Sequence, residues 1–299
     1  MQTVLDAIGS TPLVEIDGIF VKLEYRNPSG SIKARLARAL IERAERQGLL
    51  HPGDTIVEAS SGNTGNAMSM VAAVKGYHMI VVMPAGLSHE RTAISTAFGA
   101  EIRTVGTFHV TDALAEADRL GNLPGHFAPH QFSSEWNVDE NREWLGPEIV
   151  AQLPEDRLPD AFLMGVGTGG TLIGVGQHFR EVNPLVRIIA LEPSESTTIQ
   201  CGDINLHRIE GISDGFVPTI YQRHRHLVDD VIDVHSDDAI AEMRRLASHF
   251  GMLVGPSSGA NLVGARRLRD QMPAGSTIVT VFADEGEKYL SEYFSPSAV

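Results

Sequence analysis

The sequence predicts an α/β fold of two lobes, each with a mostly parallel, twisted sheet flanked by helices. Three observations lead to this prediction. Segments in which apolar residues recur at helical spacing alternate with short apolar runs of strand length. These runs are continuously apolar, which is typical of parallel strands covered on both faces. Glycine-rich and serine-rich turns stand between strands and helices, where ligands gather in parallel α/β folds.

The amino-terminal half is expected to alternate regularly. Apolar residues recur at helical spacing in four segments, which predict helices over 35–50, 66–77, 89–99 and 110–122. Compact apolar runs predict strands over 54–62, which leads into a turn, and over 78–84 and 101–106. The loop-rich stretch over 125–142, which contains HQFSSEWN, is where we expect the chain to cross between the lobes.

The carboxyl-terminal half continues the same alternation. Helices are predicted over 141–153, 170–182 and 259–272, and strands over 160–167, 187–193 and 276–284. The segment 229–251 predicts a strand followed by a helix. No internal repeat, heptad array or low-complexity tract interrupts the pattern. Continuous apolar strands joined by helices therefore predict parallel sheets throughout.

Composition narrows the class of protein. The 299 residues carry a formal net charge of −14, which argues against binding to nucleic acid or to anionic membranes. No basic segment with an apolar run opens the chain, and the most apolar stretch is too short to span a bilayer. The single cysteine, Cys201, excludes an intrachain disulfide and a cysteine-rich metal centre. We expect a cytoplasmic protein without a metal site.

Four small polar turns carry the candidate chemistry, and we expect each to follow a strand and open a helix. They lie at 29–33, 60–65, 165–171 and 255–261. One such turn is weak evidence because glycine is useful at any tight turn, but four indicate one shared ligand site. The turn at 165–171 leaves backbone N–H groups at the positive end of a helix dipole. This arrangement favours a phosphate held by amides alone.

Two of these turns also have an ordinary structural interpretation. The SSGNTG segment could grip a carboxylate through hydroxyls and N–H groups, but serine, threonine and asparagine are equally common helix caps. Lys33, at the end of NPSGSIK, is either a solvated surface lysine or a lysine whose amine does covalent chemistry. Gln131 and Thr171 are similarly ambiguous. These segments alone do not decide between the two interpretations.

A second class of function competes at the turn 165–171. Gly165, Gly167 and Gly170 satisfy GxGxxG, and Glu192 follows about twenty residues later, as the ribose-binding acid does in dinucleotide folds. This hypothesis predicts a nicotinamide- or flavin-dependent oxidoreductase. It leaves Lys33 and the SSGNTG turn without a role, which counts against it.

Taken in order, the motifs resemble those of the cysteine synthases. The chain is similar to O-acetylserine sulfhydrylases and cystathionine β-synthases of the pyridoxal-phosphate fold-type II (tryptophan synthase β) superfamily. The resemblance runs from IGSTPLV (8–14) to KYLS (288–291). It rests on NPSGSIK, SSGNTG, HQF, LGPEI, GVGTGGTLIG, GFVP, GPSSGA and ADEGEKYLS.

The resemblance implies pyridoxal 5′-phosphate as cofactor and a role for each motif. Lys33 is the catalytic residue, since the family's motif lysine holds the cofactor as a Schiff base and then acts as the base. Ser257, with Ser258 as the fallback, faces the pyridine nitrogen. The implied cofactor-binding residues are Lys33, Asn63, Gly167, Thr168, Gly169, Gly170, Thr171 and Ser257. The implied substrate-binding residues are Ser60, Ser61, Gly62, Asn63, Thr64 and Gln131.

The implied reaction is β-replacement at O-acetylserine or O-phosphoserine, through an aminoacrylate, with a sulfur nucleophile to give L-cysteine. A smaller, mobile domain over 34–141 would grip the substrate. A larger domain made of 1–33 and 142–299 would bind the cofactor phosphate. The resemblance also implies a homodimer and allows serine acetyltransferase as a partner.

The chain departs from the family mostly around the substrate. Ala34 replaces the usual aspartate, and the segment 133–144 differs from the common pattern. Other reactions therefore stay open: cystathionine β-synthase, diaminopropionate synthase, serine or threonine ammonia-lyase, or a catalytically silent relative. Arg208 could pair with an anionic leaving group such as phosphate, although a surface role is the simpler interpretation.

Overall fold

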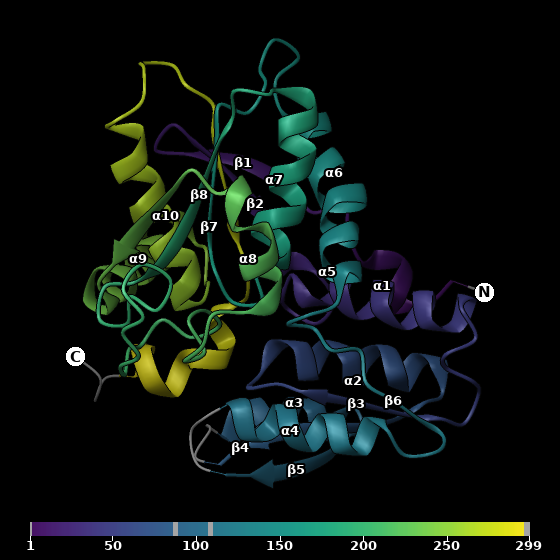
Figure 1. Ribbon diagram of the computed structural model, residues 1–299. Coiled ribbons are helices and arrows are strands. Elements are labelled where there is room, and N and C mark those ends of the chain that lie inside the picture. Colours follow the sequence, from purple (N-terminus) through teal and green to yellow (C-terminus); the bar gives the residue numbers. More distant parts are fainter. Residues whose placement is uncertain (1, 86–88, 107–109, 296–299) are drawn as a thin grey trace. The chain divides into compact units, whose positions relative to one another are not determined.

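The computed structural model describes residues 2–85, 89–106 and 110–295 and confirms the predicted α/β class (Figure 1). The chain forms two compact units. The first consists of Met1–Gly9 and Asn27–Asn137, and the second of Ser10–Arg26 and Val138–Val299. These bounds differ from the predicted ones at 33/34 and 141/142, chiefly because the lysine turn lies in the first unit. A mobile role for the smaller domain stays a prediction.

The first unit contains a four-stranded parallel sheet in the order β5-β4-β3-β6. Its strands are β3 (Thr55–Ala59), β4 (His78–Pro84), β5 (Glu101–Val105) and β6 (His126–Phe127). Its helices are α1 (Lys33–Arg46), α2 (Asn63–Lys75), α3 (His89–Ala97) and α4 (Val110–Gly121), and α5 (Glu135–Glu140) begins at its end. Alanine and leucine side chains of α4 pack on β3 and β4, while α1 packs against α2.

The second unit contains a six-stranded sheet in the order β1-β2-β10-β7-β8-β9. Its strands are β1 (Leu13–Ile16), β2 (Ile19–Leu23), β7 (Ala161–Gly165), β8 (Arg187–Pro193), β9 (Asp230–Val234) and β10 (Ile278–Phe282). Its helices are α6 (Gly146–Gln152), α7 (Gly170–Val182), α8 (Thr219–His224), α9 (Ser236–Phe250) and α10 (Pro256–Arg269). The central strands β2, β7 and β10 are buried along their whole length, which explains their continuous apolar pattern.

One antiparallel pair departs from the parallel pattern, and the sequence prediction missed both of its strands. β1 and β2 form a hairpin in which Val14 pairs with Val21. The connecting residues, Asp17 and Gly18, both have positive φ, at 52° and 75°. Two such residues make the turn that best fits the twist of a hairpin, and Asp-Gly is one of its preferred sequences.

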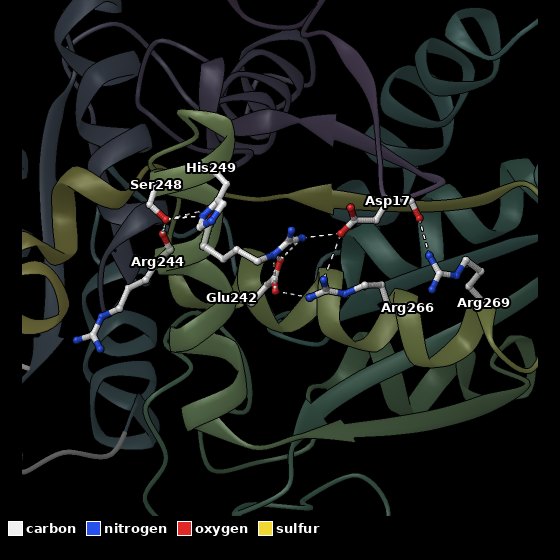
Figure 2. Close-up of polar contacts among 8 residues, drawn as sticks. Asp17, Glu242, Arg244, Ser248, His249, Arg266 and Arg269 are labelled. Carbon is white, nitrogen blue, oxygen red and sulfur yellow. Dashed lines mark hydrogen bonds and ion pairs between the residues drawn. The ribbon is translucent and has the colours of Figure 1, made fainter.

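A cluster of charged side chains joins this hairpin turn to α9 and α10 (Figure 2). The Asp17 carboxylate accepts hydrogen bonds from Arg245 at 2.5 Å and Arg266 at 3.2 Å, and its backbone carbonyl accepts one from Arg269 at 2.6 Å. The Glu242 carboxylate also accepts hydrogen bonds from Arg245 and Arg266, and the Glu242 side chain is only 7% exposed. A nearly buried carboxylate therefore holds two guanidinium groups in place.

Glu242→Ala is expected to lower the free energy of unfolding by about 1–3 kcal/mol, because it removes the more buried of the two carboxylates that Arg245 and Arg266 share and leaves them with Asp17. Asp238→Ala is the matched control on the same helix. Its carboxylate pairs with Arg267 at 2.8 Å, but both side chains are about half exposed, so the cost should stay below about 1 kcal/mol. Urea denaturation of the wild type and the two variants measures both changes in the free energy of unfolding. Equal losses in the two variants would contradict the stabilising role of Glu242.

Two further observations concern the described residues as a whole. None of the helices in the described ranges is both long and apolar enough to cross a membrane. Likewise, no three His, Cys, Asp or Glu side chains among them are grouped so that they could hold a metal ion.

Candidate active site

Two of the four turns stand directly at the carboxyl end of a parallel strand, as predicted. The turn at 60–65 follows β3, and the turn at 165–171 follows β7. The other two do not follow a strand directly. A short 3₁₀ helix, Glu24–Arg26, separates β2 from the turn at 29–33, and the turn at 255–261 follows α9 after an isolated bridge at Val254. All four nevertheless open a helix.

Lys33 is the first residue of α1, at the end of a tightly bonded turn. Gly30 has a positive φ of 67°, and its N–H donates to the carbonyl of Asn27 at 2.7 Å. The Asn27 side chain in turn accepts the N–H of Gly9 at 2.9 Å. A cation at the amino-terminal end of a helix is electrostatically unfavourable. The position therefore suits a lysine whose amine is bound covalently to another group. Ala34, next to it, is completely buried.

The SSGNTG turn is built around the hydroxyl of Ser60. That oxygen accepts the N–H groups of Gly62 at 3.1 Å and Gly65 at 2.9 Å, so Ser60 holds the turn in shape. Gly65 has to be glycine, because a Cβ there would lie 2.7 Å from a methyl group of Val81. The cap residue Gly62 supplies no side-chain cap to α2, and the first turn contains no acidic residue. An anion would therefore meet N–H groups and hydroxyls here.

Gln131, which the resemblance assigns to substrate binding, lies beside this turn. Its side-chain oxygen accepts the hydroxyl of Thr64 at 2.6 Å, and its amide nitrogen donates to the carbonyl of Ala59 at 2.8 Å. Asn137 donates to the Gln131 backbone carbonyl at 2.9 Å. The residue before it, His130, has a positive φ of 56°. The structure thus brings Ser60, Gly62, Thr64 and Gln131 together within the first unit.

Sequence reasoning missed one residue of this network, Glu58 on β3. Its side chain is only 2% exposed, and its carboxyl oxygens accept the N–H groups of Gln131 at 3.2 Å and Ala59 at 3.0 Å. Burial raises the pKa of Glu58 to about 8, although the two N–H donors act in the opposite direction. A glutamate directly before a candidate ligand turn, inside an otherwise apolar strand, was the signal that could have found it.

The turn at 165–171 has the form of a phosphate seat. Gly169 is the N-cap residue of α7, has a positive φ of 86° and offers no capping side chain, and the first turn has no acidic residue. A Cβ at Gly167 would lie 2.5 Å from the carbonyl oxygen of Gly211. Gly170 N–H donates to the Thr168 hydroxyl at 3.3 Å. These residues fit a cofactor phosphate, since glycine keeps the first-turn amides open to an anion.

A buried amide ties the phosphate turn to the helix that carries Ser257. Asn261 of α10 accepts the N–H of Gly165 at 2.9 Å and donates to the carbonyl of Val281 at 2.8 Å. Ser257 and Ser258 are both buried in the first turn of α10. The hydroxyl of Ser258 accepts the N–H of Ala283 at 3.1 Å, which engages it within the protein. That bond favours Ser257 over Ser258 as the serine available to a cofactor.

Two other sequence hypotheses lose support from the geometry. The carboxylate of Glu192 is 1% exposed and accepts the N–H groups of Ile199 at 2.7 Å and Gln200 at 3.1 Å. The Glu192 carboxylate is therefore bonded to loop N–H groups, which speaks against a role in binding a ribose. Arg208 forms an ion pair with Asp237, and its side chain is 54% exposed. The surface interpretation of Arg208 is thus the better supported one.

Comparison with known proteins identifies the family. Residues 4–284 match the family described as pyridoxal-phosphate dependent enzyme. A cysteine synthase of Staphylococcus aureus is 40% identical over 97% of this chain and 96% of its own length. The crystal structure of an O-ureido-L-serine synthase superposes with a TM-score of 0.92 at 38% identity, covering 98% of this chain and 94% of that one. An O-acetylserine dependent cystathionine β-synthase from Helicobacter pylori superposes with a TM-score of 0.92 at 32% identity, covering 99% of both chains.

These matches span nearly the whole chain, and the identities are far above those at which only a fold is shared. They confirm the resemblance, the cofactor and the enzyme class that the motifs implied. The glycine turn before α7 and the lysine at the start of α1 are features of this chain that suit the same cofactor. The chain belongs to the pyridoxal-phosphate dependent enzyme family and is an enzyme of the cysteine synthase type.

Proposed function

We propose that this enzyme replaces the β-substituent of an O-activated L-serine with a sulfur nucleophile, giving L-cysteine. O-acetyl-L-serine is the preferred candidate substrate and O-phospho-L-serine the second. The observation that carries the proposal is the start of α2, where the N-cap residue Gly62 has no side chain, the first turn has no acidic residue, and Thr64 and Gln131 are joined by a 2.6 Å hydrogen bond. Such a site suits the carboxylate of a small amino acid. The names of the S. aureus and H. pylori relatives support the choice of chemistry and of O-acetylserine.

In this proposal each motif has one task. Lys33 anchors the cofactor, and the turn Gly167–Thr171 binds its phosphate through backbone N–H groups. Asn63 and Ser257 contact its ring, and residues 60–64 with Gln131 bind the substrate carboxylate. When bound, pyridoxal phosphate supplies an electron-withdrawing ring that acidifies the Cα–H bond of an attached amino acid.

Lys33 then does the proton chemistry. Its free amine would accept the Cα proton of the bound substrate as a general base. The Cβ–O bond breaks, and acetate leaves with the electron pair. The sulfur nucleophile forms the new Cβ–S bond, and the Lys33 ammonium returns a proton to Cα. Exclusion of water during this sequence would prevent loss of the substrate as pyruvate and ammonia.

One specific observation favours a second candidate. The O-ureido-L-serine synthase superposes as closely as the H. pylori enzyme and is more similar in sequence. The alternative is that this chain forms an O-ureido-L-serine product by the same replacement with a different nucleophile. Other reactions of the superfamily, including serine or threonine ammonia-lyase, are further alternatives. Homodimer formation and binding of serine acetyltransferase are expectations that rest on the resemblance alone, and residence in the cytoplasm is an expectation from the sequence composition.

Visible absorption of the purified enzyme tests the proposal. The yellow band of lysine-bound cofactor should change on addition of O-acetyl-L-serine, and sulfide should restore it while L-cysteine forms. O-phospho-L-serine, L-serine and L-threonine are the parallel substrates, and hydroxyurea is tested beside sulfide. A band that ignores both activated serines would contradict the proposed substrate class. Turnover with hydroxyurea but not sulfide would favour the second candidate.

A further inference from the structure

A buried carboxyl group, that of Glu58, lies at the end of the strand that precedes the candidate substrate turn. Glu58 lies in the last part of β3, two residues before Ser60, and β3 runs between β4 and β6 (Figure 1). Its partner across the sheet, Val81 on β4, is apolar, while Ala113 and Ala117 of α4 pack with Val57 and Ala59, whose side chains lie on the opposite face of the strand. Burying a carboxyl group in such surroundings is costly unless it is well bonded. A task beyond packing is therefore expected of it.

The Glu58 carboxyl group holds the backbone of Gln131 in place. It accepts the Gln131 N–H at 3.2 Å, directly after His130, whose left-handed backbone is unfavourable for a residue with a side chain. With its backbone held there, Gln131 donates to the Ala59 carbonyl at 2.8 Å and accepts from Thr64 at 2.6 Å. The chain of bonds runs from β3 through Gln131 to the first turn of α2, all within the first unit.

The charge of Glu58 matters for this turn. Burial raises the pKa of the group to about 8, with a further increase from Asp118 on α4, so the neutral form dominates near pH 7. His130 pairs with Asp118 at 3.1 Å, and both of these side chains are largely exposed. Val81, which pairs with Glu58 on β4, is uncharged. Ionised Glu58 would thus place an uncompensated negative charge beside the turn that receives a carboxylate.

We propose that Glu58 is a positioning residue for the amino-acid substrate: its carboxyl group holds Gln131, and through it Thr64, in the arrangement that receives the substrate carboxylate. The proposal rests on the proposed function of the 60–64 turn and adds a residue that acts without touching the substrate. It has a consequence for pH. As pH rises above about 8, ionisation of Glu58 weakens binding of the anionic carboxylate, so KM rises while kcat changes little.

Glu58→Ala and Glu58→Gln test the proposal in the holoenzyme. Glu58→Ala should raise KM for O-acetyl-L-serine about tenfold, the cost of losing a buried acceptor, and change kcat less than about threefold. Glu58→Gln keeps the size and one acceptor oxygen but does not ionise. Its KM should therefore stay flat from about pH 7 to about pH 9, whereas that of the wild type rises. The ratio of the two KM values at each pH cancels the titration of substrate and nucleophile.

Glu101→Gln is the matched control. Glu101 lies on β5 of the same sheet, is 57% exposed and pairs with Arg103 at 2.9 Å. It should leave KM and its pH profile unchanged. The cofactor band and thermal unfolding of every variant show whether it is folded and loaded, and Glu58→Gln serves if Glu58→Ala does not fold.

The outcomes distinguish failure of the role proposed for Glu58 from failure of the proposed function of the enzyme. An unchanged KM in Glu58→Ala, or a Glu58→Gln pH profile that matches the wild type, would overturn the role of Glu58. A parallel fall of kcat and cofactor content would do so too, because it indicates a general structural role. If wild-type enzyme shows no spectral response to any activated serine, the proposed function itself fails instead.

Discussion

Lys33→Ala is expected to abolish turnover, by about 10³-fold or more, and to remove the visible band of lysine-bound cofactor. The reason is that one amine has two tasks, covalent attachment of the cofactor and transfer of the Cα proton, and alanine can do neither. The phosphate turn before α7 is untouched by this substitution. The variant should therefore still bind pyridoxal phosphate, but non-covalently and with the spectrum of the free aldehyde.

Lys75→Ala is the control for this experiment. Lys75 ends α2 in the same unit and pairs with Glu45 of α1 at 2.9 Å, so its loss should cost stability of only about 1 kcal/mol or less. Its cofactor band and kcat should match those of the wild type. The cofactor band is measured by absorption spectra and kcat by steady-state rates. The lysine that holds the cofactor is identified by borohydride reduction followed by peptide mass analysis. Borohydride labelling of a different lysine would refute the assignment of Lys33.

Gly167→Ala is the second substitution with a large expected effect. The added Cβ would lie 2.5 Å from the carbonyl oxygen of Gly211, and both partners of this clash are backbone. No flexible side chain can give way, so the turn itself has to move, at a typical cost of about 1–3 kcal/mol. The first-turn N–H groups of α7 then miss the phosphate. We expect cofactor affinity to fall about 10- to 100-fold, since each 1.4 kcal/mol is tenfold.

Gly202→Ala separates this clash from the loss of a glycine as such. Gly202 lies in the same unit with a φ of 79°, and a Cβ there would meet nothing within 4 Å. Backbone strain of about 1 kcal/mol is then the whole expected cost, and cofactor affinity should not change. Dialysis against buffer, followed by titration with pyridoxal phosphate, gives the affinities. Equal retention of cofactor by both variants would show that the turn at Gly167 tolerates a methyl group.

Local patterns predicted most of the fold because they are dictated by local physics. Helices such as α1 and α9 have an apolar stripe, and a strand such as β7 is continuously apolar because both of its faces are covered. The hairpin could have been predicted from Asp17-Gly18, a preferred hairpin-turn sequence, but apolar runs alone do not reveal it. β6 has only two residues, too few to leave any pattern.

The candidate site was predictable in its motifs but not in its bonds. The small polar turns could be read from residue types. That Ser60 caps its own turn, or that Glu58 reaches Gln131 from 73 positions away, depends on how distant segments meet in the folded chain. The GxGxxG hypothesis went astray for the same reason. Glu192 stands at the expected spacing, but loop amides that no spacing rule describes surround its carboxylate.

The order of strands in the second unit bears on how the protein is made. β2 pairs with β1 on one side and, on the other, with β10, so Phe20 meets Val279 near the opposite end of the chain. A ribosome has to synthesise every residue between β2 and β10 before that second edge of β2 finds its partner. The first unit, in contrast, draws most of its residues from the single stretch Asn27–Asn137 and can assemble early. Until β10 emerges, the open edge of β2 is exposed to mispairing, so the addition of β10 is the step that closes this side of the nascent sheet.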